Sequence, residues 1–146
     1  MAHPDLDITP EQEANLRKLA AYLVTLPSDY PDFAMNDFTS TGGMYAVVPE
    51  CGTAACAAGH GPLAGIAFEP GESWHRYSQR AFVQDYTATG EWDWCFSAAW
   101  SRRDNTAHGA ARRILWMLDH GVPDDADDQR WGDAPLCYAP VSAEAA

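Results

Sequence analysis

The chain has 146 residues, of which 47% are hydrophobic and 12% are aromatic. This length suits one domain with one core, and the apolar content excludes a disordered chain. The formal net charge of −12, from 21 acidic and 9 basic residues, opposes direct binding to nucleic acid or to an anionic membrane and favours encounter with basic protein surfaces.

The sequence shows no targeting signal. No stretch approaches the ~20 apolar residues of a membrane span, and the first residues lack the basic and apolar regions of a secretory signal. The cysteines, Cys51, Cys56, Cys95 and Cys137, are too scattered for a disulfide framework. We therefore expect a soluble, intracellular protein with reduced thiols, and the oligomeric state stays open.

A helix begins near residue 10. Thr9 is a good N-cap, Pro10 occupies the first helical position, and Gln12 completes a capping box. Pro27 marks the end of the helix. One apolar face follows at helical spacing and consists of Leu16, Leu19, Ala20, Leu23 and Leu26.

The next segment, 27–49, is interrupted by prolines and glycines and is predicted to be an ordered loop. Within it, the range Met44–Val48 is partly β-branched and could form one isolated strand. Thr53 is a suitable cap for a short helix over Ala54–Ala58, and helical geometry could resume over Leu63–Phe68.

Three further helical segments follow. Ser73 is predicted to cap a helix that runs to about Tyr86, and the aromatic range Trp92–Trp100 is predicted to form one short helix. Thr106 caps the last predicted helix, which ends at Gly121. The sequence thus predicts a mainly α protein.

We expect a single compact helical domain over 1–146, with long ordered loops and at most a minor β element. Residues from about 1 to 8 are expected to be flexible. Residues from about 123 to 146 are expected to form an extended, acidic, Pro- and Ala-rich tail.

The most distinctive stretch runs from Cys51 through Cys56 to His60. Two thiolates and an imidazole are zinc ligands, although a fourth ligand would be needed and the short-spaced ligand pairs of structural zinc sites are missing. Alternatively, a cysteine at a helix start with a histidine one turn later forms a nucleophile and its base. The third interpretation, buried packing residues without a cofactor, is favoured.

Several aromatic and acidic residues are candidates for protein contacts. A core position is favoured for Trp92 and Trp94. Because they alternate with acidic residues, the alternative is that at least one of them is an exposed interface anchor. The other candidates lie in the C-terminal segment and are Asp124, Asp125, Asp127, Asp128 and Trp131.

Residues 51–63, 92–97 and 104–114 carry Cys-Gly-Thr-Ala-Ala-Cys-x-x-Gly-His, Trp-Asp-Trp-Cys-Phe-Ser and Asp-Asn-Thr-x-x-Gly-Ala-Ala-x-Arg-Ile. Together they resemble a group of small phage and bacterial proteins with no established activity. The resemblance covers the middle and later half of the chain and implies no catalytic or binding residue. It implies a phage or mobile-element protein that acts in the cytoplasm of a bacterial host.

These observations favour a non-enzymatic acidic protein that binds a basic surface of a host protein, such as a nucleic-acid-binding defence factor that it inhibits. One alternative is a small metal- or thiol-dependent enzyme centred on Cys51, Cys56 and His60. Another is a component of a virion or of its assembly.

Overall fold

The computed structural model describes residues 2–27, 30–35, 38–39, 43–49, 54–84, 90–102 and 105–122. Its elements, in chain order, are α1 (Pro10–Leu23), the 3-10 helix η1 (Ala58–His60), α2 (Trp74–Ala81), α3 (Glu91–Phe96), the 3-10 helix η2 (Ala98–Arg102) and α4 (Ala107–His120). The described residues form isolated β-bridges but no sheet. The predicted mainly α class is therefore confirmed.

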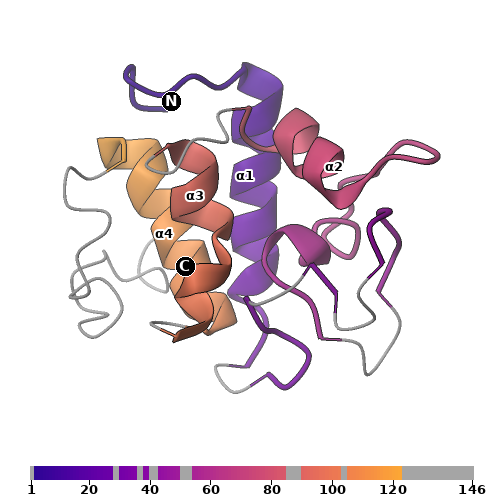
Figure 1. Cartoon of the computed structure of the whole chain (residues 1–146). Coiled ribbons are helices and arrows are strands. Elements are labelled where there is room, and N and C mark those ends of the chain that lie inside the picture. Colours follow the sequence, from indigo (N-terminus) through magenta and orange to yellow (C-terminus); the bar gives the residue numbers. More distant parts are fainter. Residues whose placement is uncertain are drawn as a thin grey trace.

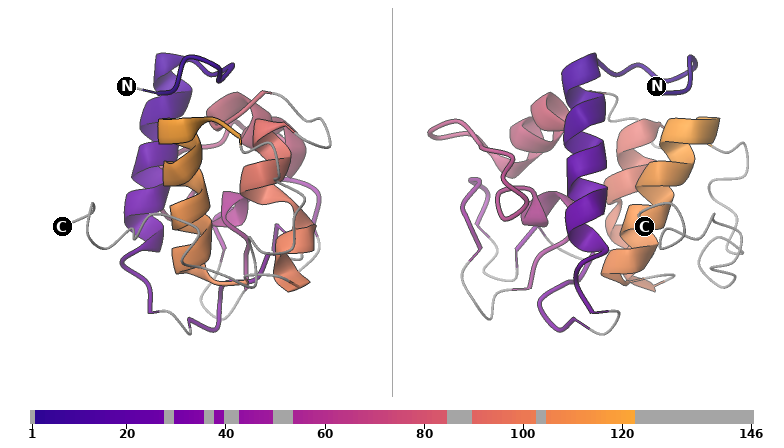
Figure 2. Two further views of the ribbon diagram at one scale, coloured as in Figure 1. Left: turned by 90° about the vertical axis from the view of Figure 1, so that its left-hand side faces the viewer. Right: turned by 180° about the vertical axis from the view of Figure 1, so that it is seen from behind.

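Helix α1 is the centre of the arrangement. It lies between the pair α3 and α4 on one side and α2 with the long loops on the other (Figure 1). Helix α4 packs antiparallel to α1, as the views from the side and from behind also show (Figure 2). Accordingly, a ring nitrogen of His108 lies 2.6 Å from the Leu26 carbonyl oxygen at one end, and the His3 N–H donates to the Leu118 carbonyl at the other.

The capping box of α1 is present as predicted. The hydroxyl of Thr9 accepts from the Gln12 N–H, and the Gln12 side-chain oxygen accepts from the Thr9 N–H at 2.9 Å. These bonds satisfy donors that a helix start otherwise leaves unpaired. The helix buries its leucine face and ends at Leu23, before Pro27.

Gln12 also reaches the end of a second helix. Its amide nitrogen donates to the carbonyl of Gln79 at 3.0 Å, and the Asn15 amide donates to the carbonyl of Ala81 at 3.0 Å. These amides satisfy carbonyls that the last turn of α2 leaves unpaired. Helix α2 begins after the predicted cap, Ser73, but it ends at Ala81, so the expected extension to about Tyr86 is wrong.

The aromatic segment forms two elements rather than the one predicted helix. Helix α3 ends at Phe96 because Ser97 takes an extended conformation, and η2 follows. The indole N–H of Trp100 folds back and donates to the Trp94 carbonyl at 2.9 Å. This bond joins the second element to the first across the break.

Helix α4 has the predicted boundaries. The Thr106 hydroxyl accepts from the Gly109 N–H at 2.9 Å, and Gly121 ends the helix with a φ of 78°, a conformation that favours glycine. Its buried face meets the leucines of α1 in one core. That core also holds Arg113, whose guanidinium lies 4.2 Å from the centre of the Trp100 ring.

Two predicted helical segments are wrong. Residues 54–57 are not helical, because the Ala55 carbonyl accepts from the Ala34 N–H and the Ala55 N–H donates to the Asp32 carbonyl. The suggested cap, Thr53, lies outside the described residues. The range Leu63–Phe68 contains turns followed by residues without regular secondary structure, with Gly65 at a φ of 90°.

The start of the chain is placed against the helices. Leu6 and Ile8 are partly buried against the core, and the Ala2 N–H donates to the Glu13 carboxylate at 3.1 Å. In the part of the chain that the structure covers, no helix combines the length and the apolar character that crossing a membrane requires. The predicted C-terminal tail lies beyond the described residues.

Candidate functional site

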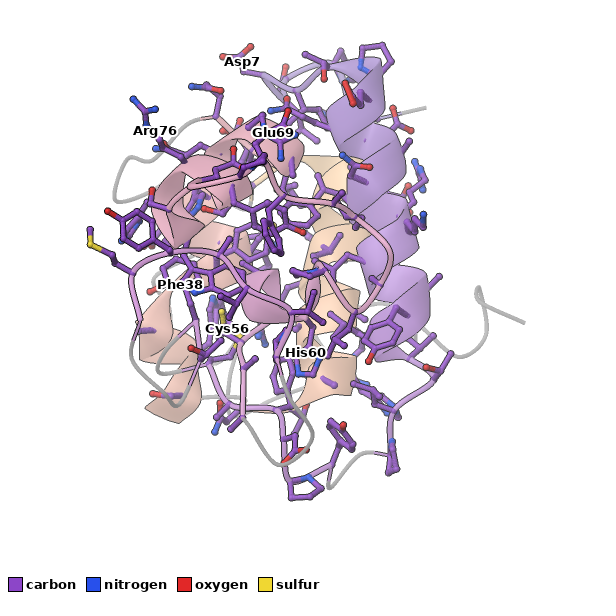
Figure 3. The ribbon with its side chains drawn as sticks, turned by 90° about the vertical axis from the view of Figure 1, so that its right-hand side faces the viewer. Asp7, Phe38, Cys56, His60, Glu69 and Arg76 are labelled. Atoms are coloured by element: carbon purple, nitrogen blue, oxygen red, sulfur yellow. The ribbon has the colours of Figure 1, made fainter. Side chains whose placement is uncertain are left out.

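The stretch from Cys56 to His60 belongs to the loop layer beside α1 (Figure 3). The His60 N–H donates to the Cys56 carbonyl at 3.0 Å, so one tight turn joins the two residues. Cys56 precedes η1 and does not lie at the start of an α-helix, so its thiol gains no stabilisation from a helix dipole. Cys51 lies outside the described residues.

His60 is a core residue enclosed by aromatic rings. Only 1% of its surface is exposed, and the ring centres of Tyr22, Tyr30 and Phe33 lie 6.0, 6.1 and 5.5 Å from that of the imidazole. One ring nitrogen, Nε2, lies 3.0 Å from the Asp32 carbonyl oxygen, and the other, Nδ1, has no hydrogen-bond partner among the residues that the structure describes.

This environment keeps the imidazole uncharged. Burial lowers the pKa of His60, because the charged ring loses its hydration, against smaller opposing effects of the backbone and carboxylate of Asp32 and of the Ala55 backbone. Burial likewise raises the pKa of the neighbouring Tyr22 phenol. The His60 ring is therefore a neutral packing element that holds the 30–33 loop and η1 against α1.

The described residues do not assemble a metal centre. Nowhere within the ranges given above do three His, Cys, Asp or Glu side chains gather closely enough to hold a metal ion. Of the three predicted zinc ligands, the structure places Cys56 and His60, both buried. The zinc hypothesis thus depends on Cys51, whose position the structure does not describe.

The thiols of Cys56 and Cys95 are buried and form no disulfide. Burial raises the pKa of Cys95 well above its usual range, because a thiolate there would lose its hydration. Its S–H donates to the Met117 sulfur at 3.6 Å. These two cysteines have the surroundings of packing residues.

Trp92 and Trp94 are buried, so the alternative of an exposed anchor is wrong for both. The Trp92 indole N–H donates to the Ser78 hydroxyl at 2.8 Å, and that of Trp94 donates to the Arg113 carbonyl at 2.8 Å. Their alternation with acidic residues was misleading because Glu91 is itself buried. The other predicted contact residues, Asp124, Asp125, Asp127, Asp128 and Trp131, lie outside the described residues.

The exposed apolar side chains of the described chain gather elsewhere. Met44, Tyr45, Val47 and Val48 are exposed by 66%, 58%, 47% and 55%. We call residues 44–48 the apolar edge segment. The sequence predicted its extended character but not its exposure, because a short β-branched run fits a buried strand equally well.

Within the described ranges, backbone hydrogen bonds hold the apolar edge segment on one side only. The Ala46 N–H donates to the Glu72 carbonyl at 2.8 Å, and the Trp74 N–H donates to the Met44 carbonyl at 2.8 Å, around an antiparallel bridge between Tyr45 and Ser73. In this pattern the N–H and carbonyl of Tyr45 point away from Ser73. The predicted isolated strand is thus a single bridge.

An ion pair supports the other side of this bridge. The Arg80 guanidinium donates to both oxygens of the Glu72 carboxylate, at 2.7 and 2.9 Å, and to the Ala67 carbonyl at 3.1 Å. These bonds lower the pKa of Glu72. The Glu72 carbonyl accepts from the Ala46 N–H. The Arg80–Glu72 ion pair therefore also stabilises the backbone to which the apolar edge segment is hydrogen-bonded.

Comparison with known proteins adds no assignment. No family model, curated protein or solved structure matches the chain.

Proposed function

We propose that this chain is a non-enzymatic acidic binding protein that engages a basic surface of another protein. The supporting observation is an exposed run of apolar side chains, the apolar edge segment, on a chain of net charge −12. Exposed apolar side chains that lie together supply contact area, and opposite charge speeds the encounter and excludes acidic partners.

Four of the 21 acidic residues are concentrated in one short part of the sequence. Asp124, Asp125, Asp127 and Asp128 place four carboxylates within five positions near the C-terminus, next to Trp131. A cluster of this kind attracts lysine and arginine side chains and repels phosphate. It favours a basic protein over nucleic acid as the partner.

The nature of the partner follows from the resemblance to small phage and bacterial proteins. In that setting the basic partner is a protein of the bacterial host, and a nucleic-acid-binding defence factor offers such a surface. The chain would act as an inhibitor by covering the face that otherwise holds phosphates.

The alternative of a thiol-dependent enzyme draws little support from the described residues. Cys56 and His60 are 3% and 1% exposed, so neither meets a substrate from solvent without a change of structure. A component of a virion or of its assembly stays a separate hypothesis, and a stable homo-oligomer in light scattering would favour it.

The test is capture of partners from nuclease-treated host lysate on the immobilised chain. We expect a partner that is retained at low ionic strength and released at high ionic strength, because salt screens exposed charges. The control is the variant in which Asp124, Asp125, Asp127 and Asp128 are replaced by asparagine, and it should retain less. If no retained protein is lost at high salt, the proposal fails.

A further inference from the structure

We propose that the apolar edge segment, residues 44–48, is a docking edge to which an extended segment of the partner adds as a β-strand. The partner segment would alternate apolar residues with lysine or arginine. This inference rests on the proposed function for the charge of the partner and on the backbone geometry for its extended form.

The backbone geometry leaves one edge unused. Tyr45 forms no backbone hydrogen bond in the described part of the chain, and neither does Val47. Because successive residues of an extended chain turn their N–H and carbonyl groups to opposite sides, Val47 shares the free edge with Tyr45. Two residues spaced by two, each with an unused donor and acceptor, match the pattern that an added strand requires.

Backbone hydrogen bonds already hold the opposite edge, so the free edge is preorganised for binding. The bonds to residues 72–74 fix Met44 and Ala46, and the side chains of Ala46 and Pro49 are buried. The segment therefore loses little conformational freedom when a strand is added. Its exposed side chains offer apolar contacts on both sides of the new pair.

Charge argues against a second copy of this chain as the occupant. Each copy carries a net charge of −12, so pairing of two edges brings like charges together. A segment that carries lysine or arginine gains from the same field. The partner is accordingly a basic extended peptide.

The experiment uses the full chain and a defined probe, an acetylated and amidated peptide of about seven residues that alternates valine with lysine. We expect the peptide to shift the amide resonances of Tyr45 and Val47 in NMR spectra. The Val47→Pro variant removes one donor from the free edge and no internal bond, so it should bind about tenfold more weakly. Val47→Thr keeps the donor and should bind within a few-fold of the parent.

The following controls separate strand addition by a basic peptide from nonspecific binding. Leu63→Ser removes an exposed apolar side chain elsewhere and should bind like the parent. A peptide N-methylated at every residue cannot donate along its backbone and should not bind, a result that stands even if Val47→Pro does not fold. A peptide with glutamate in place of lysine should bind at least several-fold more weakly.

Three results would overturn the inference: no binding of the lysine peptide, equal binding of its N-methylated form, or a homodimer that Val47→Pro dissociates. The proposed function has its own readout. If Val47→Pro still captures a salt-sensitive partner from lysate, strand addition fails while the acidic binding protein stands.

Discussion

The ring of Phe33 stacks on the imidazole of His60, with 5.5 Å between the ring centres and 23° between the planes. Phe33 comes from a loop and His60 from η1, and Tyr22 on α1 lies against the same imidazole. The stack thus joins three parts of the chain that are distant in sequence. The stack is stable only while the imidazole is uncharged, because the buried ring has no water to hydrate a charge.

The protein should lose stability as the pH falls below about 6.5, the ordinary pKa of histidine. Burial lowers the pKa of His60 in the folded chain, so the unfolded chain binds the proton first and the free energy of unfolding falls with pH. Urea unfolding at pH 7.5 and 5.5 measures this loss. Glu13 and Glu72, whose pKa values are lowered from 4.5, act only at more acidic pH.

The variant His60→Phe should remove much of this pH dependence. Its ring fits among the same aromatic neighbours, and the Asp32 carbonyl keeps a partner in the Ala55 N–H. The control Tyr22→Phe keeps both His60 and the ring against it, so it should keep the pH dependence. An unchanged slope in His60→Phe would assign the effect to other groups.

The Thr9→Ala variant, which lacks the N-cap side chain of α1, should be less stable than the parent by about 1 kcal/mol. The hydroxyl that accepts from the Gln12 N–H is lost, and that donor lies in the first turn. Thermal and urea unfolding measure the change. Thr9→Ser keeps the hydroxyl and should stay within about 0.5 kcal/mol of the parent; equal losses in both variants would contradict the role of the cap.

The Gly59→Ala substitution should lower the free energy of unfolding by about 2 kcal/mol or more. A methyl group there would lie 2.0 Å from the Phe38 carbonyl oxygen and 2.9 Å from the side chain of Ala55, so backbone must move. The control is Gly43→Ala, because a methyl group at Gly43 meets nothing within 4 Å, and it should change stability by less than about 0.5 kcal/mol. Similar unfolding midpoints for the two variants would refute this close approach.

Cys56 and Cys95 should resist alkylation while the chain is folded. Both are buried, and the raised pKa of Cys95 leaves little thiolate, so iodoacetamide should modify them about tenfold or more slowly than a free thiol. Peptide mapping by mass spectrometry assigns the label. The same sites should react freely in denaturant, and fast labelling of native Cys56 would revive the thiol-enzyme hypothesis.

Local signals in the sequence predicted the helix starts. Thr9, Ser73 and Thr106 each cap the helix expected of them, because a cap depends on a hydroxyl and an N–H only a few residues away. The end of α2 and the course of residues 54–57 depend on distant partners. Ala55 bonds to Ala34 and to Asp32, and no periodicity in the sequence signals those contacts.

The surface was harder to predict than the core. Burial of Trp92 depends on a hydroxyl from α2, and exposure of Met44 depends on a backbone bond to Trp74, so neither follows from residue type. At Gly59 the structure requires a residue without a side chain. There the reason is contact with the Phe38 backbone, since Gly59 does not have a positive φ.

The two bonds that the Gln12 side-chain amide makes, one through its oxygen and one through its nitrogen, have a kinetic consequence. One closes the first turn of α1 and the other closes the last turn of α2, so neither terminus can open without disturbing the other. Amide hydrogens in these two turns should therefore exchange with solvent at a common rate, as one cooperative unit. A ligand that stabilised the first turn of α1 would thereby slow fraying of the last turn of α2, the helix that begins beside the apolar edge segment.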